Sequence, residues 1–296
     1  MLHKILPQRF SRRLIQKTLF LFISFCVVSC SNDSTTATQP YTETDVDLGT
    51  HKLRTYQVQH QSKYLVVFES GLGDGHLAWN PSGTAAEINE LAQAVGSDIL
   101  LYDRAGYGNS GISHTARNID RLRSELEQII QQKAQGRKVI LVGHSLGGMI
   151  IRDYAIKNPT KVAALLFVDS MHEGYNNPTV EDYIYQAMYT QFGSNFGGTL
   201  EARELAEDIA YGALLPQLPN VPVVALTSMK DDATSEQSDL LNGASRQQWY
   251  QAHEQLGNGL SDFTHIATVN SGHYIQLEEP ELVIENILLL LSKLPK

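Results

Sequence analysis

Short runs of apolar residues alternate with amphipathic segments along most of the chain. Continuous apolar runs predict buried strands, whereas apolar positions spaced three and four residues apart predict helices. Strands are expected at 42–48, 51–59, 64–68, 99–102, 138–142, 162–168, 221–226 and 265–269. Helices are expected near 83–95 and 118–134, from the turn at 143–148 to about Asn158, and near 280–292. This alternation predicts an α/β fold in which helices cover both faces of a mostly parallel, eight-stranded sheet.

The N-terminal residues follow a different pattern. The segment up to Lys17 carries five basic residues and no acidic one, and the eleven-residue apolar run 18–28 follows it. Such a run is too short to span a bilayer but long enough for the hydrophobic core of an export signal. It ends in Val27-Val28-Ser29-Cys30, which resembles the lipobox of bacterial lipoproteins. In that family, cleavage precedes the cysteine and its sulfur receives a diacylglyceryl group.

Cleavage before Cys30 would separate a signal peptide, residues 1–29, from a polar tether, residues 30–40. Cys30 would then be the lipid attachment residue, and two or more acyl chains on it would anchor the protein stably. We therefore expect an exported protein held by lipid in the bacterial cell envelope, at the outer membrane or the periplasmic face. The alternative is an ordinary secretory signal and a secreted, soluble protein.

Gly143-His144-Ser145-Leu146-Gly147 lies between a predicted strand and a predicted helix. In this context a Gly-x-Ser-x-Gly motif forms a nucleophile elbow, a tight turn that exposes the serine hydroxyl at the edge of the sheet. The flanking glycines are needed because a β-carbon at either position would collide with the neighbouring strand or helix. The N–H group of Leu146, at the helix start, is expected to face a developing oxyanion.

A serine nucleophile needs a histidine base that is oriented in turn by a carboxylate. Among the ten histidines, His273 is the candidate base, since it lies in a loop between the last predicted strand and the last helix. Asp231 is the favoured acid because it follows strand 221–226 at the same edge of the sheet. Asp232 is the alternative, and Asp169, at the end of strand 162–168, is a further candidate.

Five stretches together resemble the α/β-hydrolase superfamily, and most closely its branch of small serine hydrolases with a helical cap. They are FESGLGDGHLAW at 68–79, YDRAGYGNSG at 102–111, VGHSLGGMIIRDYA at 142–155, VDS at 168–170 and SGHYIQLEEPELVIENI at 271–287.

This resemblance implies a second oxyanion donor on the loop after the third strand, which maps onto the N–H of Leu72. Many members have His-Gly before that position, whereas this chain has Ser70-Gly71, so no role for that histidine carries over. Asp103 and Arg104 fall in a loop whose residues, in the family, fix loop geometry rather than touch the substrate.

The connection between the strands at 162–168 and 221–226 is too long for an ordinary loop, so structure of its own is expected there. In the family this insertion is the cap. We therefore predict a core formed by residues 41–170 and 220–296, and a helical cap at 171–219. Its tyrosines and phenylalanines could line a pocket for an acyl or aromatic group.

These features predict a serine hydrolase that cleaves an ester-type bond, a carboxylic ester or thioester, in a small substrate with an acyl group. No cofactor and no metal are expected. The net charge of −9 argues against nucleic acid as a partner, because such binding depends on positive charge. Two alternatives stay open: a prolyl iminopeptidase-like aminopeptidase or lactonase using the same triad, and a non-catalytic binding lipoprotein.

Overall fold

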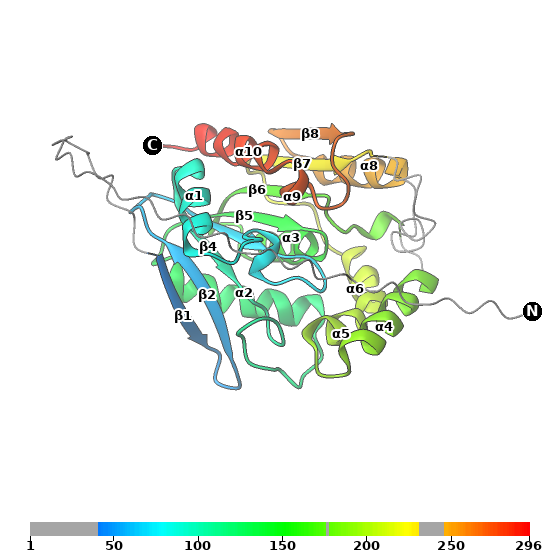
Figure 1. The fold of residues 1–296 in the computed structure, drawn as a ribbon. Helices are drawn as coiled ribbons and strands as arrows, with labels where there is room; N and C mark the ends of the chain where they lie inside the picture. The colour runs from blue at the N-terminus through cyan, green and yellow to red at the C-terminus, as the bar shows by residue number, and fades with distance from the viewer. Residues whose placement is uncertain (1–40, 176–177, 231–245) are drawn as a thin grey trace, which may run out of the picture. The chain divides into compact units, whose positions relative to one another are not determined.

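Eight strands form one sheet in the order β1-β2-β4-β3-β5-β6-β7-β8 (Figure 1). The computed structural model describes residues 41–175, 178–230 and 246–296. Strands β1 and β2 pair in antiparallel fashion, β2 is antiparallel to β4, and the remaining pairs are parallel. The predicted eight-stranded, mostly parallel sheet is confirmed. The strands are β1 (Tyr41–Asp47), β2 (Lys52–Val58), β3 (Leu65–Glu69), β4 (Asp98–Tyr102), β5 (Val139–His144), β6 (Val162–Val168), β7 (Val223–Ser228) and β8 (Phe263–Thr268).

The central strands are buried on both faces, which explains why they are continuous apolar runs rather than alternating ones. Alternate side chains point to opposite sides of the sheet. Val67 and Leu141 belong to the core beneath helices α2 (Ile119–Lys133) and α3 (Leu146–Lys157). Val66 and Val142 belong to the core beneath α1 (Ala85–Val95) and α10 (Pro280–Lys293). The sheet is therefore packed between two apolar layers, and the loops lie at the ends of its strands.

The four helices for which the sequence predicts bounds, α1, α2, α3 and α10, begin and end close to the predicted positions. Thr84 and Asn118 cap α1 and α2, because each side chain accepts a hydrogen bond from a backbone N–H in the first turn of its helix. The helices are α1 (Ala85–Val95), α2 (Ile119–Lys133), α3 (Leu146–Lys157), α4 (Pro178–Phe192), α5 (Gly197–Ala202), α6 (Leu205–Gly212), α8 (Arg246–Glu254), α9 (Ile275–Glu278) and α10 (Pro280–Lys293), with 3₁₀ turns η1 (His76–Ala78), η2 (Glu173–Tyr175) and η3 (Gln255–Gly257).

Helices α4, α5 and α6 occupy the connection between β6 and β7 (Figure 1). Gly197, at the start of α5, donates its N–H to the carbonyl of Gly106 in the loop after β4. A β-carbon on Gly197 would lie 2.4 Å from the Ala105 carbonyl oxygen, so α5 packs directly against this loop. The inserted helices therefore meet the core at the carboxyl ends of the parallel strands.

None of the helices within the described ranges is both long and apolar enough to cross a bilayer.

Candidate active site

Ser145 lies in the sharp turn between β5 and α3. Its backbone angles are φ 51° and ψ −123°, which a non-glycine residue adopts only at a cost. A β-carbon on Gly143 would lie 2.7 Å from the Gly147 carbonyl oxygen, and one on Gly147 would lie 2.4 Å from the Glu69 carbonyl oxygen. Glycine is therefore required on both sides of the serine, because the helix passes so close to its own strand and to β3.

Two backbone N–H groups can serve as oxyanion donors beside Ser145. Leu146 opens α3, and the first N–H groups of a helix have no partner within the helix and attract negative charge. Leu72 follows Gly71 in the loop after β3. A β-carbon on Gly71 would lie 3.1 Å from Ser145 Cβ, so the loop that carries Leu72 packs against Ser145.

His273 lies in the loop between β8 and α9, and His144 connects this loop to the turn that carries Ser145. The Nε2 atom of His144 lies 3.0 Å from the backbone carbonyl oxygen of His273. Because a carbonyl can only accept, His144 donates and carries its proton on Nε2. Burial lowers the pKa of His144 to about 3, so this ring stays neutral. His144 therefore joins the two loops on which Ser145 and His273 stand.

Asp169 is the carboxylate that the structure brings to His273. Its Oδ2 lies 2.7 Å from His273 Nδ1, and its side chain is fully buried. Asp169 also lies close to Ser145, because His144 of β5 pairs with Val168 of β6, so that Ser145 and Asp169 both follow paired residues of adjacent strands. The structure thus places the third sequence candidate beside the predicted base.

Arg246, at the start of α8, contacts the other oxygen of the Asp169 carboxylate, Oδ1, which also accepts the Ser228 N–H at 3.0 Å. Burial raises the pKa of Asp169, but the hydrogen bond from His273 and the charges of His273 and Arg246 outweigh it and hold that pKa below its usual value. The Arg246 guanidinium also lies 4.6 Å from the centre of the Trp249 ring. No pattern in the sequence pointed to Arg246, because its role depends on where α8 packs.

The other predicted site residues fall outside the described ranges. Asp231 and Asp232 lie within 231–245, and Cys30 lies within 1–40. The preference for Asp231 as the acid and the assignment of Cys30 as the lipid attachment residue therefore stay predictions. In the described ranges, no group of three or more His, Cys, Asp or Glu side chains is arranged to hold a metal ion.

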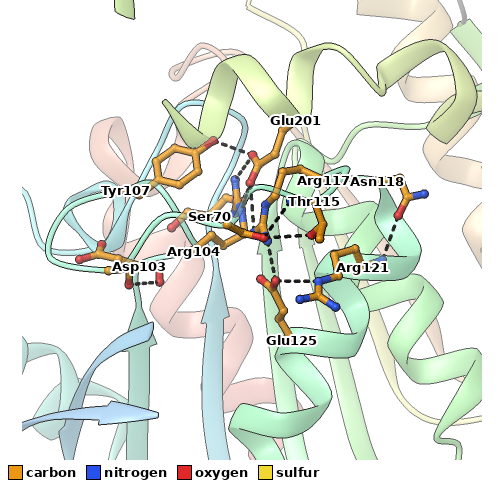
Figure 2. A network of polar contacts seen from close by, with 12 residues as sticks. Ser70, Asp103, Arg104, Tyr107, Thr115, Arg117, Asn118, Arg121, Glu125 and Glu201 are labelled. Atoms are coloured by element: carbon orange, nitrogen blue, oxygen red, sulfur yellow. Dashed lines mark hydrogen bonds and ion pairs between the residues drawn. The ribbon is translucent and has the colours of Figure 1, made fainter. Parts of the chain in front are cut away.

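Asp103 and Arg104 fix the geometry of neighbouring loops through hydrogen bonds, as the resemblance implied. Asp103 accepts hydrogen bonds from the His76 backbone N–H and the Tyr56 hydroxyl, each at 2.9 Å. Arg104 is buried and donates to the carbonyl oxygens of Ser70 and Gly71, each at 2.7 Å (Figure 2). Both residues thus hold the loop that follows β3.

The site brings to one edge of the sheet a hydroxyl at a sharp turn, a histidine in contact with a buried carboxylate, and backbone N–H groups at a helix start. These are the kinds of group that nucleophilic acyl transfer uses. All lie at the carboxyl edge of the sheet: Ser145 and Leu146 follow β5, Asp169 follows β6 and His273 follows β8. This is the edge at which open α/β sheets bind their ligands.

Sequence comparison identifies the same fold. The profile described as the alpha/beta hydrolase fold matches residues 64–267. YqjL of Bacillus subtilis is 24% identical over 241 residues, which cover 77% of this chain and 85% of YqjL. Palmitoyl-protein thioesterase ABHD10 of Homo sapiens is 32% identical over 111 residues, which cover 36% of each chain. The sequence similarity to ABHD10 thus covers about a third of that protein.

Comparison with solved structures extends the likeness over most of the chain. A thermophilic esterase from Thermogutta terrifontis superposes with a TM-score of 0.65 at 16% identity, covering 86% of this chain and 98% of the esterase. Mouse alpha/beta hydrolase domain-containing protein 10 superposes with a TM-score of 0.62 at 19% identity, covering 86% of this chain and all of that one. At such low identity these neighbours establish the fold alone.

Proposed function

Because the chain belongs to the alpha/beta hydrolase fold family, we propose that it is a serine hydrolase that cleaves a carboxylic ester or thioester through an acyl-enzyme intermediate. The observation that carries the proposal is the hydrogen bond between His273 Nδ1 and Asp169 Oδ2, at the same edge of the sheet as Ser145. A histidine held by a buried carboxylate beside a strained serine is the arrangement that activates a hydroxyl.

In the proposed reaction, Ser145 Oγ attacks the carbonyl carbon of the substrate while His273 Nε2 takes the hydroxyl proton. The tetrahedral intermediate places its negative oxygen at the N–H groups of Leu72 and Leu146. His273 then returns the proton to the leaving alcohol or thiol as the carbon–oxygen or carbon–sulfur bond breaks. Water repeats these steps on the acyl enzyme, releasing the acid and restoring Ser145.

We assign the acid role to Asp169 in place of Asp231. The Asp169 carboxylate orients the imidazole with its proton on Nδ1 and stabilises the imidazolium that forms during the reaction. Its low pKa supports this role, because the carboxylate stays ionised across the neutral range. The position also satisfies the chain order serine, aspartate, histidine that is typical of the fold.

The substrate is proposed to be a small molecule with an acyl group. The name of ABHD10, a palmitoyl-protein thioesterase, supports the inclusion of thioesters beside oxygen esters. We also propose that the protein is exported and held at a membrane by lipid on Cys30, on the basis of the sequence Val27-Val28-Ser29-Cys30.

Replacement of Ser145 by alanine tests the reaction. We expect Ser145→Ala to abolish p-nitrophenyl ester turnover and labelling by a fluorophosphonate probe while the melting temperature stays close to that of the wild type. A panel of esters, thioesters, lactones and prolyl amides with acyl groups of graded length then defines the bond. An active Ser145→Ala variant, or a wild-type protein that turns over only amides, would contradict the proposal.

A further inference from the structure

The loop that carries Leu72 is held on both sides by side chains that converge on one residue of the inserted helices. Arg104 binds the residue before Leu72, and Tyr107 binds the residue after it. Both Arg104 and Tyr107 also bind Glu201 of α5. Figure 2 shows this convergence, with Glu201 between Arg104 and Tyr107.

On the first side, Arg104 fixes the peptide unit that contains the Leu72 N–H. The carbonyl oxygen of Gly71 and the N–H of Leu72 belong to one planar, trans peptide, so they point in opposite directions. Arg104 Nη2 donates to that carbonyl oxygen at 2.7 Å. The bond therefore turns the N–H away from Arg104. The positive charge also polarises the peptide and makes its N–H a stronger donor.

On the other side, Tyr107 fixes the next peptide. Its hydroxyl accepts the backbone N–H of Gly73 at 3.1 Å and donates its own proton to Glu201 Oε2 at 2.6 Å. Gly73 has a positive φ of 84°, and a β-carbon on it would lie 3.0 Å from the Cε atom of Met188 in α4. Backbone and neighbours thus leave this side of the loop little freedom.

Glu201 is the common partner. It is fully buried in α5 and accepts Arg104 Nε at Oε1 and Arg104 Nη2 at Oε2, each at 2.8 Å. Arg104 in addition donates from Nη1 to Glu69 Oε1 at 2.9 Å and to the Ser70 carbonyl. All five donors of the guanidinium are thereby used, so the arginine has one orientation open to it.

We propose that Glu201 is a positioning residue for the oxyanion hole, because it locks Arg104 and Tyr107 in the orientations that aim the Leu72 N–H at the nucleophile. This inference rests on the proposed function, since it assigns Leu72 as an oxyanion donor. It makes α5 part of the catalytic apparatus and not only a cover over it.

Two conservative variants test the proposal in the full-length protein. Tyr107→Phe removes only the hydroxyl that joins Gly73 to Glu201, and Glu201→Gln removes the charge that holds Arg104. We expect each to lower kcat about 10- to 100-fold with KM changed less than about 3-fold, a smaller loss than the 10²–10³ that follows removal of a whole oxyanion donor. Affinity for a trifluoromethyl ketone, whose adduct with Ser145 carries the oxyanion, should fall in proportion to kcat/KM.

Glu125→Gln is the matched control. Glu125 is buried in the neighbouring part of the same ionic network, where it pairs with Arg117 Nη1 at 2.5 Å and with Arg121 Nε at 3.1 Å, but none of its hydrogen bonds reaches the loop of Leu72. We expect Glu125→Gln to lower the melting temperature as Glu201→Gln does, and to leave kcat and the ketone affinity at wild-type levels.

The outcomes separate this inference from the proposed function. A wild-type protein without ester turnover or probe labelling would contradict the function itself. An active wild type in which Tyr107→Phe and Glu201→Gln keep full kcat and full ketone affinity would overturn the positioning role alone. A loss of kcat in Glu125→Gln equal to that in Glu201→Gln would also overturn it, because the effect would then be general destabilisation.

Discussion

Replacement of Asp169 by asparagine should nearly abolish catalysis through the protonation of His273. Asparagine retains one oxygen acceptor and gains an amide donor. At this site Oδ1 faces two donors, the Ser228 N–H and the Arg246 guanidinium, whereas Oδ2 faces His273 Nδ1. The asparagine oxygen must therefore turn toward Ser228 and Arg246, which leaves its NH₂ group against His273.

That orientation of the asparagine reverses the tautomer of the His273 imidazole. His273 Nδ1 must then accept a hydrogen bond, so the proton moves to Nε2, where it blocks removal of the Ser145 proton. The variant also loses the negative charge that stabilises the imidazolium. Replacements of this kind in other serine triads cost about 10⁴ in kcat, so we expect a loss of about 10³ to 10⁴, or about 4 to 5.5 kcal/mol in the activation barrier.

The assay is steady-state hydrolysis of the best p-nitrophenyl ester at pH 7.5, with melting temperatures recorded in parallel. Asp231→Asn and Asp232→Asn are the matched controls and should keep kcat within about 3-fold of the wild type. If Asp169→Asn retains activity while one of the two controls loses it, Asp169 is not the triad acid and the reasoning from the His273 contact is wrong.

Two further predictions concern stability and location. Burial raises the pKa of Asp208 in α6 to about 8. Between about pH 4 and pH 8 the folded protein therefore binds a proton at Asp208 that the unfolded chain does not bind. The free energy of unfolding then decreases as the pH rises toward 8. Asp208→Asn should therefore raise the melting temperature most near pH 8.5 and less at pH 5. Glu207 is exposed, so Glu207→Gln should change the melting temperature little at either pH. An equal shift for Asp208→Asn at both pH values would contradict the raised pKa of Asp208. For the proposed anchor, a fatty-acid analogue supplied to growing cells should label the wild type but not Cys30→Ser, and label that survives the substitution would exclude Cys30 as the attachment site.

The sheet could be predicted from the sequence because its central strands are buried on both faces. An uninterrupted apolar run such as β6 then identifies a strand without reference to the rest of the chain. The boundaries are less certain at β8, an edge strand with polar residues, which is predicted at 265–269 and observed at Phe263–Thr268. Elements that depend on local pattern are thus predicted well, and ends that depend on pairing are predicted within a few residues.

The partner of His273 could not be chosen from the sequence. Asp169, Asp231 and Asp232 all follow strands whose carboxyl ends lie at one edge, and all precede His273 in the chain. His273 lies on the loop after β8, and β7 separates β8 from β6 in the sheet, so the contact with Asp169 depends on how far that loop reaches back along the sheet edge. The pattern of apolar runs does not specify the path of a loop.

The role proposed for Glu201 was also beyond the sequence. An acidic residue on a short helix is usually exposed to solvent, and Arg104 lies 97 residues away from it in the chain. Arg104 could be expected to fix a loop because of its place in the stretch 102–111. Its acidic partner becomes visible only when α5 is placed against that loop.

The strained backbone at the ends of β5 and β6 implies a trade-off between stability and activity. Ser145 and Asp169 both have positive φ values, 51° and 40°, and each such residue costs on the order of 1–3 kcal/mol. Hydrogen bonds hold the turn in place, since Ser145 receives the Met171 N–H at its carbonyl and donates its own N–H to Val168. Ser145, the proposed nucleophile, is therefore held in one conformation before any substrate arrives, and part of the free energy of folding maintains a turn that serves the proposed reaction at a cost in stability.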